Sequence, residues 1–399
     1  MNYRFADKVK ALKPSAIREI FKSLSDPTII SFAGGNPNPA SFPTDIIGKI
    51  SSEIFSDPLR AASALQYSVT DGYPPLVEKL TKRQKEKFGM GTQNDKLIIT
   101  TGGQQAADLV CKVLCNEGDV VICENPSFIG AMNAFRANGA KLVGVPLDDD
   151  GINTDILEEK IRQNGDKVKL IYVIPNFQNP AGLTMSAEKR RKVYEIAKKY
   201  GILIFEDNPY GELRFEGGHI PPIKAMDTEG LVLYCSSFSK ILSAGMRVGY
   251  LQGPEEVVQK VVVAKQVNDV HTNIFFQMVC DEFIGKYDLD GQIAKICDLY
   301  GKKCALMLGE MDKKFPSCVK YTRPQGGLFL WCTLPDNIDV AQFVKLALEK
   351  KVAVVTGAAF LADQTETTHC FRMNYSMPTD EQIVQGVDIL AQVINGLIG

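Results

Sequence analysis

The sequence has little of what marks metal-binding, secreted or membrane proteins. Its three histidines, His219, His271 and His369, stand far apart without the spacing of a metal site. Its ten cysteines are scattered and form no C-x-x-C pair, which is typical of a reduced, cytoplasmic protein. No apolar run approaches the roughly 18 residues of a membrane span, and the N-terminal MNYRFADKVK lacks the apolar core of an export signal. We therefore expect a cytoplasmic protein without a metal ion.

The sequence also lacks a large excess of positive or negative charge. The formal net charge is -2, so the sequence offers no basic surface for nucleic acid or for an anionic membrane. With 399 residues, 45% hydrophobic and 23% charged, the chain has the composition of an ordinary globular protein and can bury a large core. At this length a large domain with a smaller one beside it is the expected organisation.

From Lys96 onward, strand-like and helix-like segments alternate. KLIITTGG, VVICENP, KLIYVIP and ILIFEDN are strand-like, and helical patterns such as QQAADLVCKVLC and SAEKRRKVYEIAKKYG stand between them. This alternation predicts an α/β domain with a parallel sheet. After about Pro254 the sequence mixes long helical patterns with short strand-like runs, which indicates a smaller α+β domain.

The stretch LVLYCSSFSKILSAGMRVGY carries the strongest chemical signal. Its apolar run is typical of a buried strand, and Ser237, Ser239 and Lys240 follow at the carboxyl end, where ligands bind in open α/β sheets. A lysine whose pKa is lowered from about 10.4 by burial forms imines with carbonyl compounds. Arg247 and the hydroxyl groups suit a phosphate. Taken alone, the pattern is more typical of a solvated lysine and an arginine paired with a surface carboxylate.

Three other strand-like segments also end in polar or glycine residues. Gly102 and Gly103 stand before a helical pattern, where free backbone N–H groups bind anions. Asn179 and the pair Asp207 and Tyr210 follow two further strands. Each of these residue types is also common in turns and caps. Because the carboxyl ends of parallel strands meet at one edge, we expect an anion cradle, an amide, a carboxylate, a phenol and an amine in one crevice.

These segments resemble the fold type I aminotransferases that use pyridoxal phosphate, in the class I and II superfamily, and are most similar to the group of 2-aminoadipate and kynurenine aminotransferases. The resemblance covers nearly the whole chain and rests on motifs in the family's order and spacing. They are PSAIRE, FAGGNP, TTGGQQ, ENPSF, QNPAG, EDNPYGELRF, SSFSK and FRMNYS.

The resemblance implies a role for each site residue. Lys240 would form the imine with pyridoxal 5'-phosphate, Asp207 would pair with the pyridinium nitrogen, and Tyr210 and Asn179 would bind the 3-oxygen of the ring. The phosphate would be held by Gly103, Gln104, Ser237, Ser239 and Arg247, with Tyr67 reaching in from a second subunit of a homodimer. Phe128 stands where an aromatic ring, usually tyrosine, stacks on the cofactor, and Gly103 replaces the family's usual serine. Arg372 would bind the substrate α-carboxylate, with the Gly35 backbone beside it.

The implied fold is a mostly parallel seven-stranded sheet between layers of helices, with a smaller α+β domain built from the C-terminal part and the N-terminal segment. The implied division is residues 1–45 as an N-terminal arm and substrate-side loop, 46–285 as the large cofactor-binding domain, and 286–399 as the small domain. The implied activity is transfer of an amino group between an L-amino acid and a 2-oxo acid, 2-oxoglutarate or pyruvate. Lys240 would be the general base in this reaction.

Two alternatives remain. A β-elimination lyase or racemase would use the same residues on the same scaffold. A transcription regulator with an aminotransferase-like body would carry an N-terminal winged-helix head, whereas here the motifs begin at about Pro14 without a basic segment before them. The identity of the amino acid that donates the amino group is open as well. Arg18 in the N-terminal helical segment would favour an acidic substrate such as aminoadipate or glutamate if it faces the site, and is otherwise a solvated surface residue.

Overall fold

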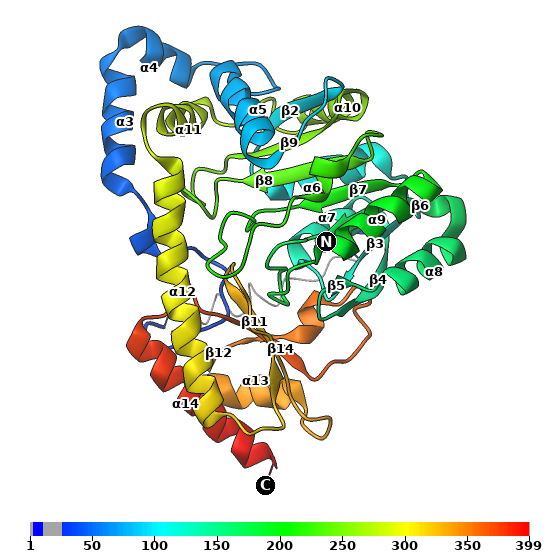
Figure 1. Ribbon diagram of the computed structural model, residues 1–399, viewed down its shortest axis with the longest axis vertical. Coiled ribbons are helices and arrows are strands. Elements are labelled where there is room, and N and C mark those ends of the chain that lie inside the picture. Colours follow the sequence, from blue (N-terminus) through cyan, green and yellow to red (C-terminus); the bar gives the residue numbers. More distant parts are fainter. Residues whose placement is uncertain (1–2, 11–25, 399) are drawn as a thin grey trace.

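A computed structural model describes residues 3–10 and 26–398, and a large eight-stranded sheet forms its centre (Figure 1). The strand order is β2 (Asp95–Thr100), β9 (Gly249–Pro254), β8 (Val232–Ser237), β7 (Leu203–Asp207), β6 (Val168–Val173), β3 (Val120–Asn125), β4 (Lys141–Asp148) and β5 (Gly151–Ile152). β8, β7, β6, β3 and β4 pair in parallel, and β9 runs antiparallel to both of its neighbours. The predicted mostly parallel α/β sheet is confirmed.

The predicted strand count of seven is wrong by one short strand. β5 has two residues and pairs antiparallel with the end of β4. It forms directly after the turn at Asp149 and Asp150, where Gly151 adopts a φ of +122°. A two-residue strand carries no alternation of apolar and polar positions, so the sequence pattern does not reveal it.

Helices cover both faces of the large sheet (Figure 1). α6 (Gly103–Leu114), α7 (Ile129–Ala137) and α10 (Glu255–Gln266) pack on one face, and α8 (Thr154–Asn164) and α9 (Ala187–Tyr200) pack on the other. The strands are buried on both faces, which is why they read as continuous apolar runs. The 3-10 turns η2 (Gly165–Lys167) and η3 (Ile223–Met226) lie in the connections.

A second group of helices extends from the β2 edge of the sheet. It contains α3 (Thr44–Ser56), α4 (Pro58–Leu65), α5 (Pro74–Phe88) and α11 (Ile274–Lys286). The longest helix, α12 (Leu289–Lys314), runs from this group down to the smaller sheet (Figure 1). α1 (Asp7–Lys10) lies near the N-terminal end of the chain.

The smaller sheet has the order β10 (Lys320–Tyr321), β11 (Phe329–Thr333), β14 (Cys370–Asn374) and β13 (Val355–Thr356), and all of its pairs are antiparallel. α13 (Val340–Glu349), α14 (Asp380–Ile398) and η4 (Gly357–Phe360) pack around it. The N-terminal segment joins this region, because β1 (Ile30–Ser31) pairs in parallel with β12 (Val352–Ala353) and leads to η1 (Pro39–Ser41). A smaller α+β unit that includes the N-terminal segment was predicted and is confirmed, while its boundaries at residues 45 and 285 stay a prediction.

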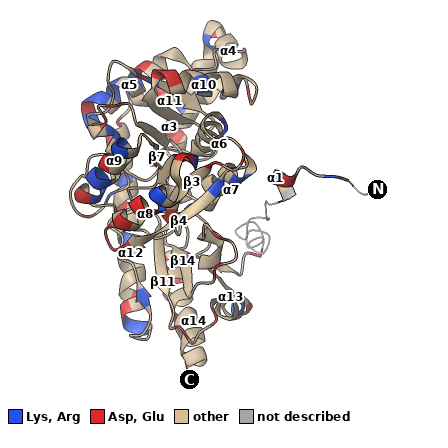
Figure 2. Ribbon diagram, turned by 90° about the vertical axis from the view of Figure 1, so that its right-hand side faces the viewer, with Lys and Arg blue, Asp and Glu red and all other residues tan. Residues whose placement is uncertain are grey.

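No described helix has the length and apolar character that crossing a membrane requires. Figure 2 shows lysine and arginine mixed with aspartate and glutamate on the helices of the side that faces the viewer. Most of the ion pairs among the described residues have at least one partly exposed side chain, but those of Lys224 form a fully buried cluster. Lys224 donates to Asp95 Oδ1 at 2.7 Å and to Asp227 Oδ2 at 2.9 Å, and the side chains are between 0% and 4% exposed. This cluster fixes η3 to the start of β2.

The buried cluster gives a stability prediction. Replacing Lys224 with methionine leaves two buried carboxylates without their cation, and breaking such a pair costs about 3–5 kcal/mol. Urea unfolding followed by circular dichroism should show that loss in the free energy of unfolding for Lys224→Met. The matched control is Lys198→Met, because Lys198 and Glu229 form an ion pair of similar length with both side chains about half exposed; its cost should stay below about 1 kcal/mol. Equal effects of the two substitutions would contradict the prediction.

Candidate active site

The carboxyl ends of the central strands surround a cavity of about 460 Å³. Of the predicted site residues that the structure describes, its lining contains every one except Tyr67. The predicted residues in the lining are Gly35, Gly103, Gln104, Phe128, Asn179, Asp207, Tyr210, Ser237, Ser239, Lys240, Arg247 and Arg372. Because these residues come from both the large and the smaller sheet, the cavity lies between the two.

Lys240 lies in the turn that follows β8 and projects into the cavity. Its Nζ donates a hydrogen bond to the carbonyl oxygen of Gly35 at 2.7 Å, and it lies 6.0 Å from the centre of the Tyr210 ring. Loss of solvent, together with the positive charges of Arg372 and Arg247, lowers the pKa of Lys240 to about 8. Near neutral pH the uncharged, nucleophilic form of this amine is therefore a minor fraction, but a far larger one than in a free lysine.

An anion cradle lies at the start of α6. Gly102 precedes the helix with a φ of 76°, and the backbone N–H groups of Gly103 and Gln104 have no backbone partner among the described residues, whereas that of Gln105 donates to the Gly102 carbonyl oxygen. The Ser237 and Ser239 hydroxyls are 2.8 Å apart beside this turn. The guanidinium of Arg247 packs against Gly102, because a Cβ on that glycine would lie 2.6 Å from Arg247 Nη2. The dipole of the helix, the two hydroxyl groups and the guanidinium together form a site that suits a phosphate group.

The next two residues contribute through their backbones. Gly103 is the first residue of α6, and a Cβ at this position would lie 3.4 Å from the Sγ of Cys235. The side-chain amide of Gln104 donates to the carbonyl oxygen of Gly130 at 2.8 Å, so it holds α7 against α6. For both residues the N–H groups, rather than the side chains, are the donors left for an anion.

Asp207 ends β7 and is buried. Its Oδ2 accepts a hydrogen bond from the Tyr172 hydroxyl at 2.8 Å. Burial raises the pKa of Asp207 to about 6, and the Tyr172 hydrogen bond opposes that rise. The carboxylate therefore remains ionised at neutral pH and presents a negative charge to the cavity.

Arg372 is buried on β14 and faces the cavity. It donates to Asn179 Oδ1 at 2.8 Å and to the carbonyl oxygen of Ala33 at 2.7 Å, and its Nε has no partner among the described residues. Its guanidinium lies 4.2 Å and 4.7 Å from the ring centres of Phe329 and Phe360. Burial lowers the pKa of Arg372 to about 10, which still leaves it positive. The alternative of a surface ion pair is wrong for this residue.

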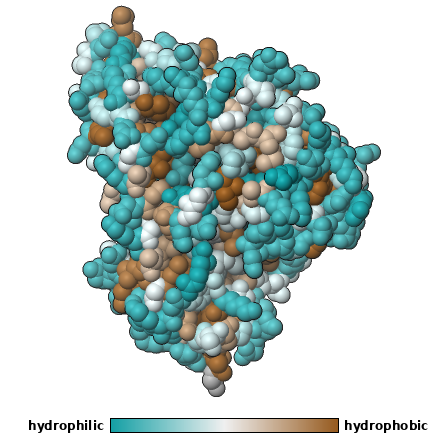
Figure 3. Space-filling model, viewed as in Figure 1, coloured by the Kyte–Doolittle hydropathy of each residue, from teal (hydrophilic) through white to brown (hydrophobic). Residues whose placement is uncertain are grey.

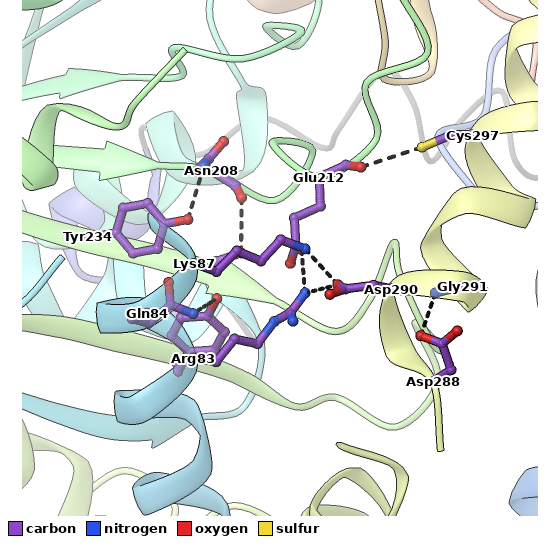
Figure 4. A network of polar contacts seen from close by, with 12 residues as sticks. Arg83, Gln84, Lys87, Asn208, Glu212, Tyr234, Asp288, Asp290, Gly291 and Cys297 are labelled. Carbon is purple, nitrogen blue, oxygen red and sulfur yellow. Dashed lines mark hydrogen bonds and ion pairs between the residues drawn. The ribbon is translucent and has the colours of Figure 1, made fainter. Parts of the chain in front are cut away.

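Tyr210 belongs to a loop that ion pairs anchor from outside (Figure 4). Glu212, two residues further along, accepts from Arg83 at 2.6 Å and from Lys87 at 2.8 Å, both on α5. The same two cations bind Asp290 in the first turn of α12 at 2.7 Å and 2.6 Å. Burial raises the pKa of Tyr210, so its phenol stays protonated. The network fixes the loop to α5 and α12.

Among the described residues, Tyr67 is the predicted site residue that does not lie in the cavity of this chain. Tyr67 follows α4, is 80% exposed and packs edge-on against His271 with 5.8 Å between ring centres. Arg18 lies outside the described residues. The cavity also contains residues that the sequence reasoning missed, namely Asn36, Ile174, Pro209, Ala244 and Phe329. For Phe329 the sequence does contain a signal of a site residue, because this phenylalanine follows a glycine pair at the start of an apolar strand.

Comparison with known proteins places this geometry in a family. The model for class I and II aminotransferases matches residues 53–390. The chain is 40% identical to aromatic-amino-acid aminotransferase 1 of Thermococcus litoralis, over 98% of this chain and 94% of that protein. A crystal structure of Pyrococcus horikoshii kynurenine aminotransferase, in complex with PMP, matches with a TM-score of 0.95 and 39% identity, covering 99% and 98% of the two chains. The α-aminoadipate aminotransferase of Thermus thermophilus, complexed with N-(5'-phosphopyridoxyl)-L-leucine, matches with a TM-score of 0.90 and 34% identity over 99% and 98%.

The cradle gives a prediction for Gly102→Ala. The methyl group would displace the Arg247 guanidinium, and the φ of 76° strains any residue with a Cβ. We expect the affinity for pyridoxal phosphate to fall at least about tenfold in an equilibrium titration, the size of one lost charge-assisted contact. Gly118→Ala is the control, since Gly118 has a φ of +87° but open space around the added methyl group. Unchanged cofactor affinity in Gly102→Ala would show that the cradle does not bind the phosphate.

Proposed function

This chain belongs to the class I and II aminotransferases, and from that premise we propose a role for each side chain of the cavity. The enzyme uses pyridoxal phosphate to move an amino group between an amino acid and a 2-oxo acid. When bound, the pyridine ring of the cofactor serves as an electron sink while the Cα–H bond of the substrate breaks. The roles that follow belong to the protein's own residues.

The residues of the cavity fit this cofactor. The open first turn of α6, the paired hydroxyls of Ser237 and Ser239 and the guanidinium of Arg247 form a site for the phosphate dianion. The buried, ionised Asp207 is suited to hold a proton on the pyridine nitrogen, because a nearby carboxylate stabilises that positive charge. Asn179 and the protonated Tyr210 are hydrogen-bond donors for the 3-oxygen, and Phe128 lines the cavity as the stacking ring.

Lys240 is the base in this proposal. With the cofactor bound, the Lys240 amine would hold the cofactor's aldehyde carbon and, when free, would serve as the base that takes up the proton from the substrate Cα and gives it back. A pKa of about 8 suits both tasks, because general bases act best near the working pH. The Gly35 carbonyl orients Nζ, which ties the position of the base to the N-terminal segment.

Arg372 is the proposed site for the substrate α-carboxylate. Its guanidinium is held by Ala33 and Asn179 and sandwiched by the rings of Phe329 and Phe360, so it is preorganised for a planar anion. The remaining wall is apolar, with Phe128, Ile174 and Phe329. We propose L-amino acids with aromatic side chains as donors, which agrees with the names of the aromatic and kynurenine aminotransferases among the relatives. The proposed acceptor is 2-oxoglutarate or pyruvate.

Substitution of Lys240 tests this function. Lys240→Ala should show no detectable turnover with a panel of L-amino acids and 2-oxoglutarate or pyruvate, a loss of at least about 10⁴-fold. Lys240→Arg, which keeps the positive charge but offers no proton-accepting amine, should be equally inactive. Turnover by Lys240→Ala at the wild-type rate would refute the assignment. In the wild-type enzyme, product that forms without any 2-oxo acid would favour the lyase alternative instead.

We also propose that the enzyme is a cytoplasmic homodimer in which Tyr67 reaches the phosphate of the partner. All ten cysteines are free, which suits a reducing compartment. Large apolar side chains on and after α4 are exposed, among them Leu59 at 84%, Leu65 at 77% and Val69 at 54%. Figure 3 shows hydrophobic atoms at the top of the molecule, where α4 lies in Figure 1. Such a cluster is typical of a protein–protein interface.

The dimer proposal predicts a loss of assembly on changing α4. The double variant Leu59→Asp, Leu65→Asp should elute as a monomer in size-exclusion chromatography with light scattering, because four carboxylates would be buried in the dimer. Its activity should fall with its dimer fraction, since Tyr67 would no longer reach the other subunit. Val384→Asp on α14 is a suitable control, as Val384 is also exposed, at 38%, but lies at the other end of the molecule. A stable, active dimer of the double variant would contradict the proposed interface.

A further inference from the structure

Tyr172 lies near the carboxyl end of β6, behind the cavity. Its side chain is fully buried, and its ring is fixed edge-on by Phe135 at 5.2 Å and tilted against Phe205 at 5.6 Å between ring centres. The hydroxyl donates to Asp207 Oδ2 at 2.8 Å. The tyrosine therefore touches neither the cavity nor solvent, and within the described residues its hydroxyl bonds only to the carboxylate that faces the cofactor site.

The other groups that face Asp207 offer it no positive charge. Glu124 on β3 is buried, and burial together with Asp207 raises its pKa to about 8, so it is largely neutral at pH 7. The Cys235 thiol on β8 and the Tyr210 phenol in the following loop also have raised pKa values and stay protonated. No lysine or arginine of the described residues forms an ion pair with Asp207. The Tyr172 hydroxyl is thus the polar contact that offsets the burial of this carboxylate.

Glu124 is itself held away from Asp207. Its Oε2 accepts hydrogen bonds from the Ile174 N–H and from Gln178 Nε2, both at 3.1 Å. These bonds fix the carboxyl group against the backbone that follows β6. Asp207 therefore accepts one short hydrogen bond from a rigidly positioned donor. Because the surroundings have a low dielectric constant, that donor has a large effect on the carboxylate.

We propose that Tyr172 is a positioning residue that keeps Asp207 ionised and oriented toward the cofactor, and so sets the acidic limb of the pH–rate profile. The inference rests on the proposed role of Asp207 in binding the pyridine nitrogen. Only the ionised carboxylate stabilises a proton there, so activity is lost as the pH falls through the pKa of Asp207. Removal of the donor raises that pKa, which moves the acidic limb to higher pH.

The test is Tyr172→Phe in the holoenzyme, since this change removes one oxygen and keeps the ring. We expect the acidic limb of kcat/KM to move up by about one pH unit, the size of a lost hydrogen bond to a charged acceptor, while kcat at pH 8, where Asp207 is still ionised, changes little. The equilibrium affinity for pyridoxal phosphate should fall more at pH 6 than at pH 8, because fewer Asp207 carboxylates are ionised at the lower pH. The KM for the amino acid should change little, because Tyr172 does not line the cavity. An unchanged acidic limb overturns the proposal.

Tyr234→Phe is the matched control. Tyr234 is also a buried strand tyrosine, and its hydroxyl accepts from Asn208 Nδ2 at 2.9 Å (Figure 4) rather than binding Asp207. Tyr234→Phe should leave the acidic limb of the pH–rate profile in place. An equal shift of that limb in Tyr234→Phe and Tyr172→Phe overturns the proposal. If Tyr172→Phe does not fold, 3-fluorotyrosine at position 172 replaces it as the test. Its more acidic phenol donates a stronger hydrogen bond, so the limb should move to lower pH, and a shift to higher pH or none overturns the proposal.

A further variant separates this inference from the proposed function. Asp207→Asn removes the carboxylate itself and should abolish most activity whether or not Tyr172 acts on it. Wild-type activity in Asp207→Asn would refute the proposed role of Asp207 and with it the inference. Loss of activity in Asp207→Asn combined with a normal pH profile in Tyr172→Phe would refute the inference alone.

Discussion

The site depends on one constraint, which is that its positively charged side chains have no anionic side chain among the described residues as a hydrogen-bond partner. In the part of the chain that the structure describes, Lys240, Arg247 and Arg372 bind only neutral oxygens, those of Gly35, Ala244, Asn179 and Ala33. Arg372 is buried, and a buried cation is costly unless an anion accompanies it, whereas Arg247 is exposed to solvent. The cavity therefore favours anions from solution, and in the proposed function these are a phosphate and a substrate carboxylate.

The two arginines divide the cavity into two anion sites. Arg247 lies with the first turn of α6 on the large sheet, while Arg372 lies on β14 of the smaller sheet. Lys240 stands between them, and both positive charges lower its pKa. In the proposed function, the same positive charges would attract the cofactor and the substrate and prepare the amine that acts on them. Asp207 would supply the opposite charge beside the ring nitrogen.

Contacts between distant segments hold these groups in place. The bond from Lys240 to Gly35 joins residues 205 positions apart, and the bond from Arg372 to Asn179 joins residues 193 positions apart. The pairing of β1 with β12 places the N-terminal segment beside β14, which is how Ala33 and Gly35 reach the cavity. The network of Arg83, Lys87, Glu212 and Asp290 fixes the Tyr210 loop from the other side.

The sequence by itself determined the class of fold and most of the site. Apolar strands that alternate with amphipathic helices permit few arrangements other than a mostly parallel sheet, and the carboxyl ends of its strands meet at one edge. The residue types at those ends, Lys240, Asp207 and Asn179 among them, were therefore predictable together. Short elements such as β5 were not predictable, because two residues carry no periodic pattern.

Only the tertiary structure decided which partner each group has. It placed Arg372 between two rings instead of on the surface, turned the side chain of Gln104 toward α7, and left Tyr67 outside the cavity of its own chain. It also brought Tyr172 against Asp207 across neighbouring strands. These outcomes depend on strand register and on packing between segments far apart in the chain, and no local propensity or motif contains that information.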